Sequence, residues 1–284
     1  MLQLVTHDNF ATCVVLYADD LLLFRPIKIQ EDYHHLQDDI LTILDWVNSN
    51  YLTLNPNKCK YIMVVSRKRY PSVPVSLTLG GTEMEKVDCF KYLGLLLCSD
   101  IMSFSKHIES ICSKARKITG LLYRRFSSAN SDTLLQLCLT LVRRHLEYAS
   151  PVLNPSTRKQ IKMLEDVEKF AMRVATRRWD TGYQDLLSMA NINVPSLESR
   201  RLQSSMCKLY KIVHGLCYFP PDIVSLSSFC RRTDRQFLLY QPFARTNAFH
   251  SSFVPNATNL WNILPERLVT SPFSVFKANV LHYL

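Results

Sequence analysis

The sequence contains no long hydrophobic run. None of its apolar stretches approaches the roughly 20 residues that a membrane-spanning helix requires, and the N-terminus has no basic segment followed by an apolar core, as a signal peptide would. Internal repeats and low-complexity tracts are absent too. With 47% hydrophobic and 20% charged residues, the 284-residue chain predicts a globular, intracellular protein of one large domain or two smaller ones, in the nucleus or the cytoplasm.

Closely spaced cysteine pairs are also missing. The nine cysteines are scattered and none forms a Cys-x-x-Cys pair, so their spacing gives no zinc site. Their odd number and their apolar neighbours predict reduced, mostly buried thiols.

Basic residues are absent from the first 24 positions. Residues 1–57 contain only Arg25 and Lys28 against eight acids, a net charge of −6, which leaves +16 for residues 58–284. An acidic start followed by a long basic body favours a polyanionic partner such as nucleic acid. Ordinary solvation of a charged surface is the alternative, and charge alone does not exclude it.

Two adjacent acids lie inside the acidic start. Asp19 and Asp20 stand between two apolar runs, residues 14–17 and 21–24, which predict a strand, a tight turn and a returning strand. Only a turn can bring adjacent carboxylates toward one site, because neighbouring side chains of a strand point to opposite faces. Carboxylates held so close repel each other unless a cation such as Mg²⁺ lies between them. The alternative is a solvated turn, where aspartate is common.

The run Tyr17-Ala18-Asp19-Asp20 resembles the Tyr-x-Asp-Asp hairpin in the palm of reverse transcriptases, in the form found in non-LTR (LINE-type, CR1- or L2-like) retrotransposons. The resemblance implies an RNA-directed DNA polymerase whose partners are an RNA template and a DNA primer. It implies that Asp19 and Asp20 are catalytic ligands of a two-magnesium site, and that Tyr17 lies against the nucleic acid.

Two further elements follow in the order that this family has them. Residues 55–58, Asn-Pro-Asn-Lys, resemble a turn whose lysine, here Lys58, lies near the nucleotide triphosphate and supplies a positive charge and a proton. Residues 89–97 resemble the Phe-Lys-Tyr-Leu-Gly element that grips the primer end. That resemblance implies nucleic-acid contacts for Phe90, Lys91, Tyr92 and Gly94. A surface lysine and ordinary core residues are the alternatives.

Apolar periodicity predicts the elements around these motifs. Residues 30–49 carry an apolar residue every three or four positions and predict a helix with His34 and His35 in solvent. Short strands are predicted at 51–54 and 61–65, and a hairpin at 77–84 around two adjacent glycines.

From residue 103 onward the pattern becomes helical and basic. Helices are predicted after a cap at Ser105, then at about 131–148, 156–176, 196–214 and 273–284. The first of these helices carries the bases Lys114, Arg116, Lys117, Arg124 and Arg125. Amphipathic helices with basic outer faces suit a thumb that grips a duplex, although the solvated faces of a helical bundle would look similar. Residues 141–151 and 244–265 again resemble the LINE-type thumb and C-terminus, except that Arg144 replaces a proline.

The resemblance extends over nearly the whole chain, but no part of it resembles the upstream half of the polymerases of this family. Asp8 is the only acid before the hairpin, and no segment resembles the fingers. We therefore expect an α+β chain: part of a polymerase palm, with antiparallel strands and a helix, at 1–100, a helical thumb-like region at 101–217 and a C-terminal extension at 218–284. We expect it not to be catalytically competent by itself. The alternatives are a non-catalytic basic module that binds RNA or duplex, and a non-functional retroelement remnant.

Overall fold

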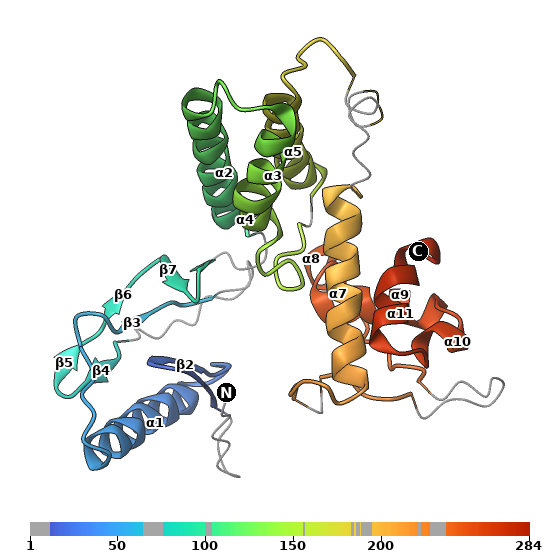
Figure 1. The fold of residues 1–284 in the computed structure, drawn as a ribbon. Coiled ribbons are helices and arrows are strands. Elements are labelled where there is room, and N and C mark those ends of the chain that lie inside the picture. The colour runs from blue at the N-terminus through green and yellow to red at the C-terminus, as the bar shows by residue number, and fades with distance from the viewer. Residues whose placement is uncertain are drawn as a thin grey trace. The chain divides into compact units, whose positions relative to one another are not determined.

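The computed structural model describes residues 12–64, 76–99, 104–155, 157–182, 185, 188, 195–220, 223–227 and 237–284. The chain divides into two compact units, Met1–Ile101 and Met102–Leu284. Strands occur mainly in the first unit and helices dominate the second (Figure 1). This confirms a chain of mixed α and β structure. No helix in the described ranges is long and apolar enough to cross a membrane.

The first unit begins with the hairpin expected from the two apolar runs. Strand β1 (Cys13–Tyr17) pairs antiparallel with β2 (Asp20–Phe24). Cys13 lies opposite Phe24 and Tyr17 opposite Asp20, so only two residues form the turn.

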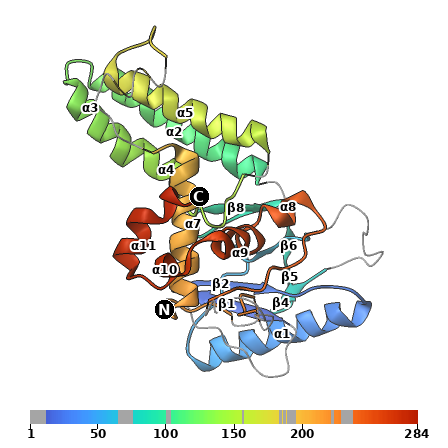
Figure 2. The ribbon, with the colours of Figure 1, turned by 90° about the vertical axis from the view of Figure 1, so that its right-hand side faces the viewer.

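An ion-pair network ties this hairpin to helix α1 (Gln30–Ser49), which runs beside it (Figures 1 and 2). Arg25, directly after β2, pairs with Asp32 at 3.3 Å and with the buried Asp39 at 3.7 Å. Thr12 donates a hydrogen bond to Asp39 and accepts one from Arg25 at 3.1 Å. The helix predicted at 30–49 is confirmed, and His34 and His35 are exposed as expected. A buried carboxylate needs such partners, so the network fixes one end of the hairpin on α1.

Six short strands complete the described part of the first unit: β3 (Lys60–Tyr61), β4 (Thr78–Leu79), β5 (Thr82–Glu83), β6 (Glu85–Lys86), β7 (Cys89–Tyr92) and β8 (Leu95–Cys98). β4 and β5 form the predicted hairpin, because Gly80 and Gly81 supply the positive φ angles of its turn, 56° and 80°. The pairing of β3 with β6 is parallel, unlike the expected antiparallel strands.

The strand predicted at 51–54 is wrong. Tyr51 has a φ of 57° and is 97% exposed, and residues 52 and 53 are exposed as well. An alternating pattern stabilises a strand only where one face is buried, and here neither face is. Of the strand predicted at 61–65, only Tyr61 belongs to a strand, and Val65 lies outside the described residues.

The prediction that the cysteines are reduced is wrong for one pair. Cys89 and Cys98 lie directly opposite each other in the β7–β8 ladder, with Cα atoms 4.0 Å apart, and their sulfurs form a disulfide. Nine residues separate them in the sequence, so no spacing motif pointed to this pairing. Cys112 and Cys138 are buried free thiols as expected, and burial raises the pKa of Cys138 to about 11. The other free cysteines of the described chain are only half-buried, namely Cys13, Cys59, Cys207 and Cys217. Cys230 lies outside the described residues.

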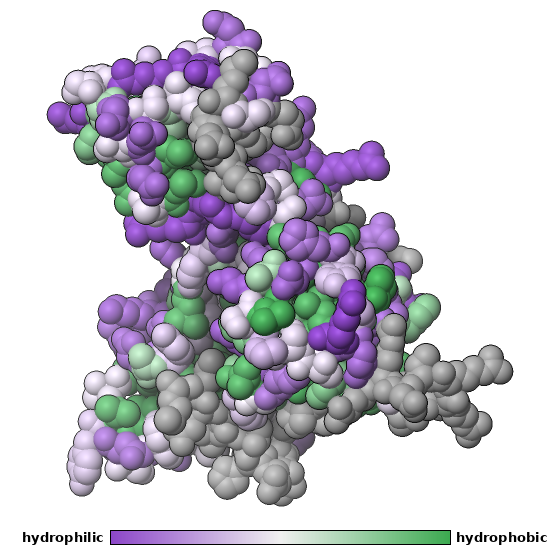
Figure 3. Space-filling model, turned by 45° about the vertical axis from the view of Figure 1, so that its right-hand side comes forward, coloured by the Kyte–Doolittle hydropathy of each residue, from purple (hydrophilic) through white to green (hydrophobic). Residues whose placement is uncertain are grey.

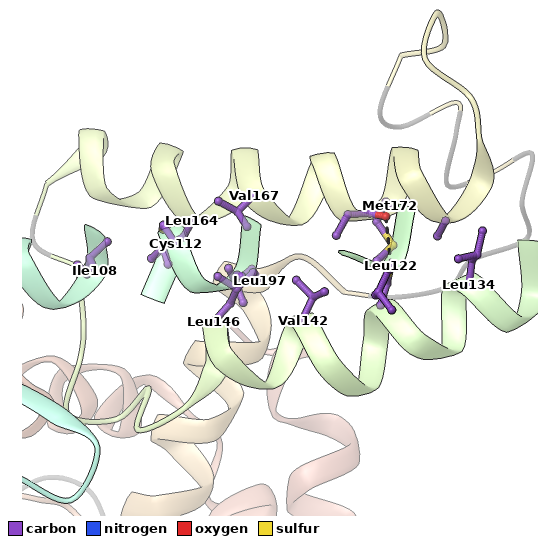
Figure 4. Close-up of a cluster of buried hydrophobic side chains, with 14 residues drawn as sticks. Ile108, Cys112, Leu122, Leu134, Val142, Leu146, Leu164, Val167, Met172 and Leu197 are labelled. Carbon is purple, nitrogen blue, oxygen red and sulfur yellow. Dashed lines mark hydrogen bonds between the residues drawn. The ribbon is translucent and has the colours of Figure 1, made fainter. Parts of the chain in front are cut away.

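The second unit opens with a helical bundle: α2 (Ser105–Arg125), α3 (Ser131–Leu137), the π-helical segment η1 (Cys138–Val142), α4 (Arg143–Glu147) and α5 (Arg158–Thr176). Figure 4 shows the buried side chains that join them, among them Ile108, Val142 and Leu164. The helix predicted at 131–148 is therefore a continuous helical run whose middle is π-helical. Ser105 is not a cap: its hydroxyl accepts a hydrogen bond from Gln160 at 3.0 Å, and Phe104 holds the N-cap position.

The remaining helices of the described chain are α7 (Leu197–Val213), α8 (Asn247–His250), α9 (Phe253–Ile263), α10 (Glu266–Val269), α11 (Phe273–Asn279) and the 3₁₀ turn η2 (Val280–His282). Gly215 follows α7 with a φ of 65°, as predicted for the end of this helix. The expected final helix is confirmed as α11 and η2.

Helix α7 belongs to two hydrophobic clusters. Its first residue, Leu197, packs into the core of the α2–α5 bundle, whereas Met206 and Leu209 pack with the C-terminal helices around Trp261. The Trp261 indole donates a hydrogen bond to the carbonyl of Phe237 at 2.8 Å, and Asn262 bonds both backbone groups of Leu239. The Leu-Trp-Asn run of the C-terminus thus holds residues 237–239 against α9 through hydrogen bonds.

A buried ion-pair network fixes the start of α7. The Arg200 guanidinium, 7% exposed, pairs with Glu147 of α4 and with Glu168 of α5, and it donates to the carbonyl of Pro195. Arg143 also pairs with Glu147, at 2.5 Å. Three helices therefore meet at one guanidinium.

We expect the Cys89–Cys98 disulfide to stabilise the first unit. In the chain-entropy model a loop of about ten residues gives roughly 2.5 kcal/mol. Cys98→Ser should therefore lower the free energy of unfolding in non-reducing buffer and change it much less with dithiothreitol present, and urea unfolding of the whole chain measures both. Cys59→Ser, which removes a free thiol of the same unit, is the control. Equal effects of Cys98→Ser in both buffers would contradict the disulfide.

Candidate functional site

The tip of the β1–β2 hairpin presents both acids of the Tyr-Ala-Asp-Asp run to solvent. Asp19 and Asp20 are exposed, and Tyr17 is 47% exposed. Tyr17 and Asp20 are cross-strand partners and share one face of the hairpin. The tip can therefore present a carboxylate and an aromatic ring side by side.

The turn itself holds a residue in an unusual conformation. Ala18 has a φ of 53°, in the left-handed region that glycine normally occupies. A positive φ at the first of two central residues is the pattern of a type II′ hairpin turn. A positive φ costs alanine about 1 kcal/mol of conformational free energy relative to glycine. Strained residues of this kind are concentrated at functional sites, which makes this tip the first place to look for one.

The second motif hairpin lies close to the first. Tyr92, the last residue of β7, has its pKa raised by burial and, secondarily, by the negative charge of Asp20. Its hydroxyl is buried and makes no hydrogen bond in the described structure. The structure thus brings Tyr92 of the primer-grip-like element near Asp20 of the hairpin tip.

The other residues of the primer-grip-like element lie at its surface. Phe90, Lys91 and Gly94 are exposed. Leu93 and Gly94 form a two-residue turn with φ angles of 44° and 81°, the values of a type I′ turn. The element is a tight hairpin that offers a lysine and an aromatic ring to solvent.

Lys58 lies outside the two motif hairpins. It is exposed in a polar turn held by Asn55, whose carbonyl accepts from the backbone N–H of Lys58 at 3.0 Å and whose side chain accepts from Asn57 at 3.1 Å. In the described part of the chain, no hydrogen bond or ion pair links its ammonium group to Asp19 or Asp20. The sequence prediction for Lys58 remains a prediction.

The donor set for magnesium is incomplete among the described residues. They contain no group of three or more His, Cys, Asp or Glu side chains that could hold a metal ion, and Asp8 lies outside the described residues. Two carboxylates leave most of the octahedral positions around Mg²⁺ to water. We therefore assign no catalytic step to a metal at this tip.

A separate basic surface covers the outer face of α2. Lys117 and Arg124 are seven residues apart, or about two turns, and Lys114 and Arg125 form a neighbouring row three turns long. Ser110 and the exposed Leu121 lie between these rows, whereas Ser113 and Gly120 lie between the Lys117–Arg124 row and Arg116. Arg116 is exposed on another side of the helix, where its charge acts on the Cys112 thiol. The five predicted bases therefore form one face of four, with Arg116 apart.

Helix α4 extends this basic face, which the sequence analysis did not foresee. The charges of Lys114 and Arg144 lower the pKa of His145, after the larger effect of burial, so the three side chains lie close together. The approach of Lys114 to the two α4 residues has no signal in the sequence. The bundle that carries them, at the top of Figure 3, has a largely hydrophilic surface in that view.

A cavity of about 290 Å³ lies between α5, α7 and α9. Burial lowers the pKa of Arg201 in its wall to about 10, and burial followed by the charge of Glu168 raises the pKa of Glu165 opposite. The wall thus carries both positive and negative charge, so it does not select a ligand by the sign of its charge.

We expect Ala18→Gly to stabilise the hairpin by about 1 kcal/mol, because glycine adopts a positive φ without strain. Asp19→Gly, at the neighbouring turn position that lacks a positive φ, should give no gain. Hydrogen exchange of the β1 and β2 amides measures both variants. A loss of protection in Ala18→Gly would contradict the turn geometry.

Comparison with known proteins gives a distant relative. The chain is 27% identical over 168 residues to an uncharacterized protein of Caenorhabditis elegans, an alignment that covers 56% of this chain and 83% of the worm protein. No family model and no solved structure matches the chain.

Proposed function

We propose that the chain is the palm-to-thumb part of a reverse transcriptase of the non-LTR type, and that it binds an RNA template paired with a DNA primer. The observation that carries the proposal is the meeting of two motifs in the first unit: Tyr92 lies near enough to Asp20 for the carboxylate to raise its pKa. The two segments are about seventy residues apart in the sequence. A polymerase needs its acidic tip and its primer grip together.

In this proposal each exposed group has a distinct task. Lys91 contacts a backbone phosphate of the primer end, and Phe90 packs on a sugar or base. Asp19 and Asp20 face the primer terminus, where their carboxylates would supply two ligands of a magnesium site. Lys58 lies beside the triphosphate.

The basic face of α2 and α4 supports the same partner. Lys114, Lys117, Arg124 and Arg125 are exposed along about 16 Å of helix and form two neighbouring rows of positive charge. Such contacts release condensed counterions, which gives affinity without sequence selectivity.

A second candidate is a basic module that binds RNA or duplex without catalysis. It needs only the basic face of α2, because phosphate contacts give affinity without a metal ion. Both candidates share the α2 face, and they differ only in what the hairpin tip does.

We expect binding of the whole chain to an RNA–DNA hybrid to weaken steeply with salt. Replacing Lys114, Lys117, Arg124 and Arg125 by alanine should reduce the slope of log K against log[salt] by about 3, since each phosphate contact contributes roughly 0.7 to 0.9. Fluorescence anisotropy at several salt concentrations measures the slope.

The matched control removes the same charge elsewhere in the second unit. Arg158, Lys159, Lys162 and Lys277 are also exposed, and their replacement by alanine should leave the slope nearly unchanged. Equal slopes for both variants and the parent chain would mean that the α2 bases are only solvated.

We expect the chain as given not to extend a DNA primer on an RNA template, with either magnesium or manganese. The reason is the incomplete donor set, since metal-assisted transfer requires both ions to be held. A primer-extension assay of the chain beside Asp19→Asn and Asp20→Asn measures this. Extension that both substitutions abolish would show that the active site is complete.

A further inference from the structure

Two exposed aromatic side chains meet at the C-terminal ends of α2 and α5. The rings of Tyr123 and Trp179 are 6.2 Å apart at an interplanar angle of 89°. Phe170 of α5 also lies near Trp179, with ring centroids 6.2 Å apart. Tyr123 is 54% exposed and Trp179 is 45% exposed. The pair is thus a fixed aromatic surface rather than part of the core.

The neighbourhood of this aromatic pair is basic. Apart from Lys117, Arg124 and Arg125 of the four-base face, residues 116–126 and 166–180 hold five bases and three acids, and one of the acids, Glu168, is buried in its ion pair with Arg200. Arg177 donates to the carbonyls of Ser127 and Ala129 and thereby fixes the turn after α2 beside the aromatic pair. A phosphate chain passing over the two rings would meet positive charge on both sides.

The chemistry of this surface suits unpaired bases. Exposed aromatic rings flanked by arginine bind single strands, because every base can stack on a ring while its phosphate lies against a cation. The core of a protein interface is also enriched in tyrosine, tryptophan and arginine, but it is depleted in charged residues overall, whereas bases outnumber acids around these rings. In a duplex the faces of the bases are already stacked on one another. They are therefore not free to stack on these two side chains.

We propose that Tyr123 and Trp179 form a stacking site for a single-stranded nucleic acid, apart from the four-base face of α2. The inference rests on nucleic acid being the partner of the chain. Tyr123 and Arg116 lie in one row of α2, seven residues apart, so Arg116 belongs to this site and not to the duplex face. Unpaired RNA that leaves a duplex held by α2 would then be held here.

Tryptophan fluorescence tests stacking directly. The chain has three tryptophans: Trp261 is 1% exposed, while Trp46 and Trp179 are exposed. In a Trp46→Phe chain, Trp179 is the tryptophan that solvent and ligand can reach. The probes are a twelve-nucleotide oligouridylate and an abasic strand of equal length and charge.

We expect the oligouridylate to quench the fluorescence of Trp46→Phe while the abasic strand quenches far less. Trp179→Ala should weaken binding of labelled oligouridylate about tenfold, within the range for loss of one stacked base, and leave binding of the hybrid duplex unchanged. Tyr240→Ala, which removes another exposed aromatic side chain of the second unit, is the control. Quenching that does not depend on bases, or no quenching, would overturn the stacking site. Failure of the unsubstituted chain to bind the hybrid duplex would instead refute the proposed function.

Discussion

The buried guanidinium of Arg200 is the constraint on which the second unit depends. It pairs with Glu147 and Glu168 and donates to Pro195, so α4, α5 and the start of α7 share one charge centre. Removal of one partner of a buried pair costs about 3–5 kcal/mol, because the other charge stays buried and unpaired. Helix α7 then continues into the C-terminal cluster around Trp261. The two hydrophobic clusters are therefore joined through the helix that this network holds, and the surfaces of α2 and α5 are presented on the bundle it closes.

The first unit depends on a different ion-pair network. Arg25 and Asp39 hold the hairpin on α1 at one end, while its other end carries the strained Ala18 and the two exposed acids. Rigid support at the base helps a hairpin to present polar groups at its tip in one geometry. The basic and aromatic surfaces of the second unit carry the nucleic-acid half of the proposal.

The elements that could be predicted from the sequence are those that leave a local, periodic pattern of residues. The hairpin at Asp19 and Asp20, the helix at 30–49 and the basic first helix of the second unit all follow from local spacing. Contacts between distant segments have no such signal: the Cys89–Cys98 bond, the approach of Tyr92 to Asp20 and the Tyr123–Trp179 pair depend on how elements pack. The failed strand at 51–54 shows the same limit, because alternation means little where no face is buried. Helical geometry also separated Arg116 from the other four bases, although all five are close in sequence.

The most direct test of the account is a map of where nucleic acid touches the chain. An RNA–DNA hybrid with a single-stranded RNA extension, carrying 4-thiouridine at defined positions, can be crosslinked to the whole chain and the labelled peptides identified by mass spectrometry. The account predicts that thiouridines in the hybrid label peptides from α2 and from β7–β8, and that thiouridines in the extension label the peptide containing Trp179. Labels confined to α9–α11, or no labels at low salt, would contradict it.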